Sequence, residues 1–307
     1  RTIINIRPDS HSISDSVGNT WNGIIGKINL FAVSPVWIED VQVYTDIEKK
    51  ALLLKIKVGN ITGCSGSGIL EAGDSKCPVS WNEEGGYGEL NVQLDKNVSL
   101  WDEFNPSVYK IDVKLTGDNA NDIKSVTFGL REMGTEGTCF TINKRKIHFR
   151  GTHDGGVFPL TGYTAMDVES WRHIFKVCKE YGLNHVRYHS FCPPEAAFVA
   201  ADEVGIYLQP ECALWTPIFS GSEAEQWLYQ ETERILKAYG NHPSFTMLTY
   251  GNEPSGRWLE PLSDWLKHFK QKDPRRLYCM QTGRQAPIER DRDPYEYWNN
   301  EQPEQQY

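Results

Sequence analysis

The stretch NHVRYHSFCPPEAAFVAADEVGIYLQPE, residues 184–211, contains one complete strand–helix–strand unit. The strand-like NHVRYHS is followed by Pro193-Pro194, where we expect a helix to begin, and Gly205 predicts its end. The apolar segment IYLQPE then predicts a second strand. Because a helical crossover joins strands that run parallel, this stretch predicts an α/β fold.

The same unit repeats on both sides of this stretch. Thr164-x-x-Asp167 has the pattern of a capping box and predicts a helix that ends at Gly182, and Ser222-x-x-Glu225 predicts another that ends at Gly240. A further helix carries its apolar residues at Leu262, Trp265, Leu266 and Phe269. The five predicted strands are KIHFRG, NHVRYHS, IYLQPE, SFTMLTY and LYCMQTG.

These units favour a (β/α)8 TIM barrel over a doubly wound sheet. No G-x-G-x-x-G follows the first strand, and polar residues come directly after several strands, where barrel enzymes carry their chemistry. A complete barrel takes about 250 residues, whereas only five strand signals lie between Lys144 and Tyr307. We therefore expect a partial barrel, followed by the tail RDRDPYEYWNNEQPEQQY as loop or disorder.

The first part of the chain has a different period. In ALLLKIKVGN, residues 51–60, apolar and polar residues alternate, and similar runs recur up to about residue 143 with Gly, Asn, Asp and Pro between them. This spacing predicts an immunoglobulin-like β-sandwich of about seven antiparallel strands.

Composition excludes several classes of partner. A formal net charge of −9 leaves no basic face for nucleic acid, and no run approaches the roughly 18 apolar residues of a membrane span. We expect neither a cofactor nor a metal. Residue 1 is arginine with no signal-peptide pattern around it, so we expect the gene product to begin upstream. A periplasmic or extracellular location and a homo-oligomer are both compatible with the sequence.

Polar side chains gather at the predicted strand ends, namely His153, Asp154, Arg187, His189, Glu211, Asn252 and Glu253. This carboxylate-rich rim lacks the motifs of phosphoryl transfer, serine hydrolysis and zinc proteolysis. Glycoside hydrolysis fits it, because that reaction needs two carboxyl groups, one of which holds a proton near neutral pH.

Glu253 is the leading candidate within this rim. Pro254 prevents the strand from continuing, so the carboxylate should lie in a rigid turn, and Asn252 beside it could bind a sugar hydroxyl. Arg187 and His189 lie on one face of their strand. They could form a structural charge pair, or Arg187 could lower the pKa of a neighbouring carboxylate and so keep it ionised. Glu211 could bind a metal, bind sugar or pair with that arginine.

Two further features complete the predicted site. His153 and Asp154 precede Gly155-Gly156, which fits either a loop that admits substrate or an ordinary turn. Trp215 follows a strand end and could stack on a sugar ring.

Several segments together resemble glycoside hydrolase family 2, which includes β-galactosidases, β-glucuronidases and β-mannosidases. They are TWNGIIGKINLFAVSPVWIEDVQVYTD, LWDEFNPSVYKIDVKL, VTFGLRE, FTINKRKIHFRGTHDGG, NHVRYHS and YGNEPSG, in this order, up to about residue 285. The resemblance implies the end of a jelly-roll sugar-binding domain at residues 1–35, an immunoglobulin-like sandwich at 36–133 and the first five βα units of a TIM barrel at 134–307.

The resemblance also implies roles for single residues. Glu253 would be the general acid/base, Asn252 would bind the 2-hydroxyl of the sugar, and Arg187 would be the arginine of the second strand. Many members carry a histidine three residues after that arginine, where this chain has Ser190. The family's nucleophile is a glutamate at the end of the seventh strand, which the resemblance places beyond these residues.

We therefore expect a segment of a retaining exo-acting β-glycoside hydrolase that acts on terminal β-linked sugars, with β-galactosides as the leading substrate. Glu211 is the in-chain carboxylate that comes nearest to filling the role of the missing nucleophile, and the 307 residues alone should be inactive or nearly so. The rival hypothesis is a carbohydrate-binding or scaffolding protein with a degenerate half-barrel.

Overall fold

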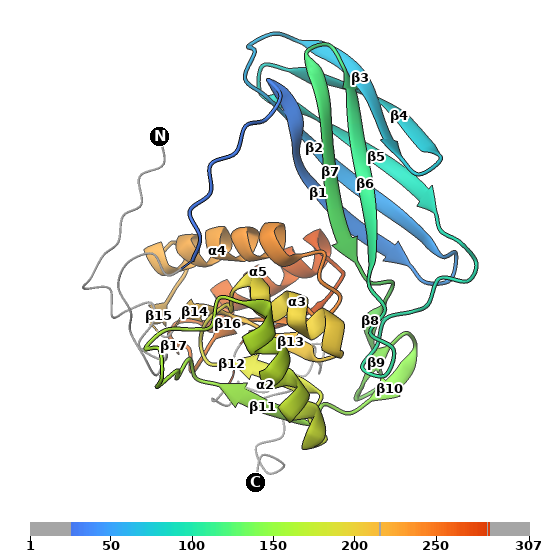
Figure 1. Cartoon of the computed structure of the whole chain (residues 1–307). Helices are drawn as coiled ribbons and strands as arrows, with labels where there is room; N and C mark the ends of the chain where they lie inside the picture. The colour runs from blue at the N-terminus through green and yellow to red at the C-terminus, as the bar shows by residue number, and fades with distance from the viewer. Residues whose placement is uncertain (1–25, 215, 281, 283–307) are drawn as a thin grey trace. The chain divides into compact units, whose positions relative to one another are not determined.

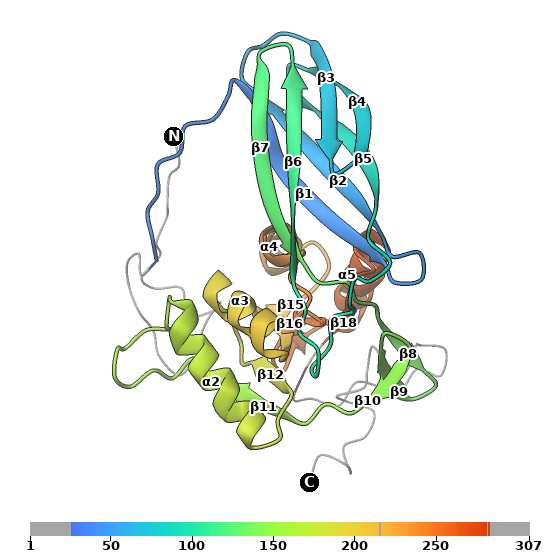
Figure 2. The ribbon, with the colours of Figure 1, turned by 45° about the vertical axis from the view of Figure 1, so that its right-hand side comes forward.

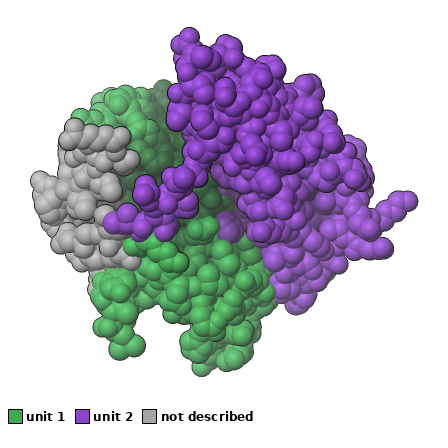
Figure 3. All heavy atoms as spheres, turned by 45° about the horizontal axis from the view of Figure 1, so that its top comes forward, with its two compact units in different colours: residues 1–27, 133–239, 244–307 green, residues 28–132, 240–243 purple. Residues whose placement is uncertain are grey.

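The computed structural model describes residues 26–214, 216–280 and 282 (Figure 1). Contacts divide the chain into two compact units, coloured separately in Figure 3. We call residues 28–132 and 240–243 the β-unit, and the remainder the βα-unit. The predicted jelly-roll remnant falls mostly on residues 1–25, which lie outside the described residues, and residues 26–35 form no helix or strand.

The β-unit contains seven strands, whose ribbons can be followed in Figure 2. Buried side chains alternate with more exposed ones along them. In β2, Leu52, Leu54, Ile56 and Val58 are at most 1% exposed while Lys55 faces solvent, as the alternation predicts. The strands are β1 (Val36–Asp46), β2 (Ala51–Asn60), β3 (Gly66–Ala72), β4 (Ser75–Asn82), β5 (Gly85–Gln93), β6 (Tyr109–Gly117) and β7 (Ala120–Phe128).

The hydrogen bonding of the seven strands differs from that of a sandwich, in which two sheets are separate. The seven strands form one closed sheet in the order β1-β2-β5-β4-β3-β6-β7. Closure is weak at two places, because β1 meets β7 through the single parallel pair Val36 and Ala120, and β4 meets β5 through two pairs. The predicted strand number is confirmed, whereas two distinct sheets are not seen.

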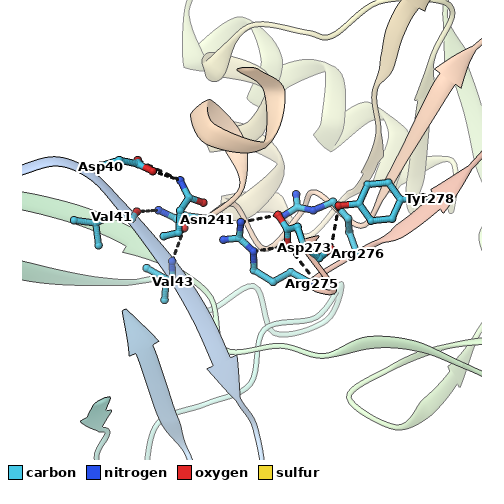
Figure 4. Close-up of polar contacts among 9 residues, drawn as sticks. Asp40, Val41, Val43, Asn241, Asp273, Arg275, Arg276 and Tyr278 are labelled. Carbon is cyan, nitrogen blue, oxygen red and sulfur yellow. Dashed lines mark hydrogen bonds and ion pairs between the residues drawn. The ribbon is translucent and has the colours of Figure 1, made fainter. Parts of the chain in front are cut away.

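A short segment distant in sequence completes the β-unit. Residues 240–243 follow α4 (Glu223–Tyr239) in the chain but belong to the β-unit by their contacts. Asn241 donates from Nδ2 to the Val41 carbonyl oxygen at 2.8 Å and accepts from the Val43 N–H at 2.8 Å (Figure 4). The side chain of Asn241 thus bonds the backbone of β1 in the way a neighbouring strand would.

The βα-unit begins with a three-stranded antiparallel sheet, β8 (Met133–Glu136), β9 (Cys139–Ile142) and β10 (Arg145–Ile147). Parallel strands and helices then alternate, as the sequence predicts. They are β11 (Gly151–Asp154), α2 (Val168–Glu180), β12 (His185–Tyr188), α3 (Glu195–Val204), β13 (Tyr207–Gln209), β14 (Glu211–Leu214), α4, β16 (Met247–Gly251), α5 (Leu259–Lys272) and β18 (Leu277–Cys279). The loops add the two-residue pair β15 (Pro217–Ile218) and β17 (Ser255–Gly256).

These strands occupy five consecutive barrel positions. β13 and β14 are the two halves of the third strand, separated at Pro210, and β11-β12-β13 and β14-β16-β18 are each parallel. A parallel bridge between Leu208 and Phe245 connects the two sets. The partial barrel predicted from the sequence is therefore present, while the predicted disordered tail lies outside the described residues.

The helix ends follow the predicted signals with one exception. Gly205 takes a left-handed conformation after α3 (φ 80°), and Gly182 does the same after α2 (φ 76°). The prediction that Thr164 caps α2 is wrong, because Asp167 is the N-cap and its side chain accepts from the Ser170 N–H at 2.8 Å. Among the described helices, none is long and apolar enough to cross a membrane.

The βα-unit core lies between the parallel strands and the helices. Large aromatic side chains fill it, and the four apolar positions predicted for α5 are all buried. At the end of α5, Asp273 pairs with Arg275 at 2.7 Å and with Arg276 at 3.3 Å (Figure 4). Burial of Asp273 opposes its ionisation, but the Arg276 and Arg275 charges outweigh it and hold the Asp273 pKa well below its ordinary value.

Candidate active site

The parallel register brings the carboxyl ends of the strands to one edge of the sheet. Arg187 in β12 pairs with His153 in β11, and Gly251 at the end of β16 pairs with Leu214 of β14. One residue later, Asn252 forms a parallel bridge with Thr282, which follows β18. Because loops at this edge carry the chemistry of barrel enzymes, it is the place to look for a site.

Arg187 is the centre of a hydrogen-bonded cluster at this edge. Its Nε donates to Glu211 Oε1 at 2.7 Å, and its Nη2 donates to Asn252 Oδ1 at 3.0 Å and also to Thr282 Oγ1. The guanidinium group of Arg187 on the second barrel strand thus contacts Glu211 on the third, Asn252 after the fourth and Thr282 after the fifth. The fork of fixed donors explains why arginine suits this position better than lysine.

Glu211 is fully buried, and both of its carboxylate oxygens accept hydrogen bonds. Oε1 accepts from Arg187 and from Thr282 Oγ1 at 3.0 Å, while Oε2 accepts from Ser190 Oγ. Of the three roles considered for Glu211, the structure supports pairing with the arginine. A nucleophile needs an exposed oxygen facing the sugar, so this geometry does not make Glu211 the second carboxylate of a glycosidase.

Asn252 is oriented by its neighbours. Its Oδ1 accepts from Arg187, and its backbone N–H donates to the Leu214 carbonyl oxygen at 3.1 Å. Since arginine can only donate, this contact assigns Oδ1 to the side facing Arg187 and leaves the two Nδ2 donors on the other side of the amide. Asn252 is 8% exposed, so only a small part of the residue reaches solvent.

Glu253 has a left-handed backbone conformation with φ 45°. This conformation is uncommon for residues other than glycine and persists where surrounding bonds enforce it. Here the Glu253 N–H donates to the Thr282 carbonyl oxygen at 2.8 Å, and the buried Pro254 follows directly. The turn leaves the Glu253 side chain half-buried at the strand end, as the Asn-Glu-Pro sequence predicts.

The structure separates His153 from Asp154. The register places His153 on the same face as Arg187, and its ring meets that of His189 edge-on with 6.2 Å between centroids. By the same register Asp154 lies on the opposite face with Tyr188, toward α2, and both Asp154 and His153 border a cavity of about 670 Å³ that Trp171 also lines. Burial raises the pKa of the Asp154 carboxyl there, although the Gly156 N–H donates to it.

The rest of the interior beneath Arg187 is neutral. His185 is two residues earlier on the same face, and burial together with the Arg187 charge lowers the pKa of His185 to about 4. Gln209, which pairs with Arg187 in the parallel register, donates from Nε2 to Thr249 Oγ1 at 2.8 Å. Within the described ranges no group of three or more His, Cys, Asp or Glu side chains could hold a metal ion.

Two residues of the cluster were not among the predicted site residues, and one predicted residue cannot be placed. Thr282 and Ser190 both contact Glu211, and Thr282 also contacts Arg187 and Asn252. The segment LYCMQTG, residues 277–283, did predict a strand, so the hydroxyl near the end of that segment was the available signal for Thr282. Trp215, predicted to stack on a sugar ring, lies outside the described residues.

Gly251 is needed for the close approach of β14 and β16 below Asn252. A Cβ atom at Gly251 would lie 2.1 Å from the Leu214 carbonyl oxygen. We expect Gly251→Ala to reduce the free energy of unfolding by about 1–3 kcal/mol, because the backbone must shift to relieve the overlap. Urea unfolding measures the change, provided that the dependence of the unfolding free energy on urea concentration has the same slope in both proteins.

Gly155→Ala is the matched control, because a Cβ atom there would meet nothing within 4 Å. We expect it to change the free energy of unfolding by less than about 0.5 kcal/mol. Equal losses in the two variants would contradict the close approach at Gly251.

Comparison with known proteins agrees with this architecture. Residues 134–305 match the family model described as Glycosyl hydrolases family 2, TIM barrel domain. The chain is 27% identical over 249 residues to a β-galactosidase of Thermoanaerobacterium thermosulfurigenes, covering 74% of this chain and 34% of the relative. It is 24% identical over 203 residues to a β-glucuronidase of Streptococcus agalactiae, covering 59% and 33%.

Solved structures share the fold. The crystal structure of a family 2 β-galacturonidase from Eisenbergiella tayi bound to galacturonate superposes with a TM-score of 0.69 at 20% identity, covering 82% of this chain and 47% of that one. A β-glucuronidase from Bacteroides uniformis gives a TM-score of 0.68 at 16% identity, covering 83% and 35%. The chain spans about a third of the length of these two curated relatives.

Proposed function

Because the chain belongs to glycosyl hydrolase family 2, we propose that it forms part of the catalytic domain of a retaining exo-acting β-glycoside hydrolase. The observation that carries the proposal is the convergence of Arg187, Asn252 and Glu253 at one end of the parallel strands. Protonation of a glycosidic oxygen requires a carboxyl group held in position, and Glu253 is a half-buried carboxyl in a backbone turn at this end of the strands.

In this mechanism Glu253 acts twice. It first protonates the leaving oxygen, and after the leaving group departs it takes a proton from the water that releases the sugar. A second carboxylate must attack from about 5 Å away. Since both oxygens of Glu211 are occupied, we propose that this nucleophile lies outside the described residues.

The other site residues have supporting roles in the proposal. Arg187 orients Asn252, whose Nδ2 donors bind a sugar hydroxyl, and His153 and His189 lie on the side of the cluster next to β11. We no longer place Asp154 in the sugar site, because its side chain faces α2. The role of Trp215 as a stacking platform remains the proposal made from the sequence.

We propose a β-galactoside as the substrate, with β-glucuronides and β-galacturonides as the alternatives that similar proteins suggest. We also propose that the β-unit is the immunoglobulin-like module of the family. The two short contacts, β1 with β7 and β4 with β5, support this assignment, because they divide the closed sheet into two layers.

The test compares two proteins, the gene product that carries residues 1–307 and the 307-residue chain alone. Each is incubated with p-nitrophenyl β-galactoside, β-glucuronide and β-galacturonide, and release of nitrophenol is followed. We expect the gene product to hydrolyse one of the three and the 307-residue chain to hydrolyse none. The reason is that the family resemblance places the second carboxylate at the end of the seventh barrel strand, whereas the described strands are the first five.

Two outcomes would overturn parts of the proposal. Hydrolysis by the 307-residue chain would mean that a carboxylate within it is the nucleophile. Binding of a glycoside without turnover by the gene product would favour the carbohydrate-binding alternative.

A further inference from the structure

Thr282 is a buried residue at the end of the fifth barrel strand, and its backbone supports the fourth. Its side chain is 3% exposed, and its carbonyl oxygen accepts from the Glu253 N–H at 2.8 Å. Its backbone also forms the parallel bridge with Asn252. These main-chain contacts do not depend on the identity of the side chain.

The hydroxyl of Thr282 contacts four groups at once. Thr282 Oγ1 lies 3.0 Å from Glu211 Oε1, 3.3 Å from Asn252 Oδ1 and 3.2 Å from the Gly251 carbonyl oxygen. Arg187 Nη2 donates to Thr282 Oγ1 and also to Asn252 Oδ1. No other hydroxyl among the described residues contacts both Arg187 and Asn252.

A hydroxyl has one proton, so these contacts cannot all be donations from Thr282. The three acceptors compete for that proton, and Glu211 Oε1 is the nearest and carries charge. The lone pairs of Thr282 Oγ1 accept from Arg187 Nη2. The hydroxyl therefore fixes Nη2 on the side of Asn252, where the same nitrogen reaches Asn252 Oδ1.

We propose that the Thr282 hydroxyl is a positioning group that holds Arg187 Nη2 against Asn252, and so keeps the Asn252 amide donors directed at the sugar. The kinetic part of this inference rests on the proposed function. The structural part, the fixed orientation of Asn252, does not. Thr282 acts through other side chains and does not itself touch substrate.

The test uses two substitutions at the same position. Thr282→Val keeps the shape and the backbone contacts but removes the hydroxyl, whereas Thr282→Ser keeps the hydroxyl. In the 307-residue chain, the side-chain amide resonances of Asn252 report its orientation by NMR. We expect Thr282→Val to shift them and to speed their hydrogen exchange at least tenfold, and Thr282→Ser to restore the parent behaviour.

Kinetics in the gene product that carries these residues give the second readout. We expect Thr282→Val to lower kcat/KM about 10- to 100-fold, the range expected from loss of one or two buried hydrogen bonds. Thr282→Ser should stay within about threefold of the parent. With a 2-deoxy glycoside the penalty of Thr282→Val should shrink, because bonds to the 2-hydroxyl strengthen in the transition state.

Thr249→Val is the matched control, since Thr249 is a buried threonine on β16 whose hydroxyl, within the described part of the chain, bonds Gln209 and neither Arg187 nor Asn252. It should leave the Asn252 resonances in place. Unchanged Asn252 resonances in Thr282→Val would overturn the inference. Shifted resonances together with a parent protein that hydrolyses no glycoside would uphold the positioning role and refute the proposed function instead.

Discussion

Glu253→Gln should lower the rate of glycoside hydrolysis by about 10²–10⁴-fold, the usual contribution of a general acid/base. Glutamine preserves the size of the side chain and the turn at φ 45°, which depends on the backbone bond to Thr282 and on Pro254. It cannot transfer a proton. The loss therefore measures chemistry and not folding, and unfolding curves of the two proteins should coincide.

The leaving group provides a sharper form of this experiment. A nitrophenolate departs with little need for protonation, whereas an alkyl alcohol needs the acid. We expect the loss in Glu253→Gln to be larger for an alkyl glycoside than for the nitrophenyl one at the first chemical step. Steady-state and burst kinetics on the gene product separate that step from the later release of sugar.

Glu260→Gln is the control, because Glu260 is an exposed carboxylate in the first turn of the helix that follows. Its rates should match those of the parent. If Glu253→Gln kept the parent rate on the alkyl glycoside, another group would be the acid.

Arg187→Met should lower the free energy of unfolding by about 3–5 kcal/mol, the cost of leaving a buried charge without its partner. Glu211 is fully buried, and without Arg187 its carboxylate keeps only the hydroxyl donors of Thr282 and Ser190. The variant also releases Asn252 Oδ1, so any activity should disappear with the stability. Urea unfolding gives the stability change.

The double variant Arg187→Met/Glu211→Leu tests the cause. Removing both charges should recover at least half of the unfolding free energy that Arg187→Met loses, because neither group is then left buried and ionised. Arg172→Met is the surface control, since Arg172 pairs with Glu169 and Glu203, whose side chains are 78% and 38% exposed. That change should cost less than about 1 kcal/mol. A double variant no more stable than Arg187→Met would point to lost packing and not to charge.

The local signals in the sequence predicted the elements well. Strand-like segments, Pro193-Pro194 and the glycines at 182 and 205 mark the βα units at the positions where the structure has them. The start of α2 was misplaced because Thr164 and Asp167 both have capping side chains three residues apart. The choice between them depends on tertiary packing, which buries Thr164.

The site was predictable only in part, for a geometric reason. Placing both His153 and Asp154 at the rim ignored the alternation of a strand, in which adjacent residues face opposite sides. Arg187, Glu211 and Asn252 were named as separate rim residues, but their shared contacts are long-range. The role of Thr282 depends on the register of β18 against β16, which no local pattern specifies.

The bond between Asn241 and β1 has a consequence for synthesis on the ribosome. The seven strands of the β-unit are complete by Phe128, but their partner at residues 240–243 emerges only after just over a hundred further residues. At 5–20 residues per second this delay is roughly 5–20 s. Throughout that interval the Val41 carbonyl and the Val43 N–H lack their bonds to Asn241, so the hydrogen bonding of β1 is completed only when the fourth barrel strand is being made.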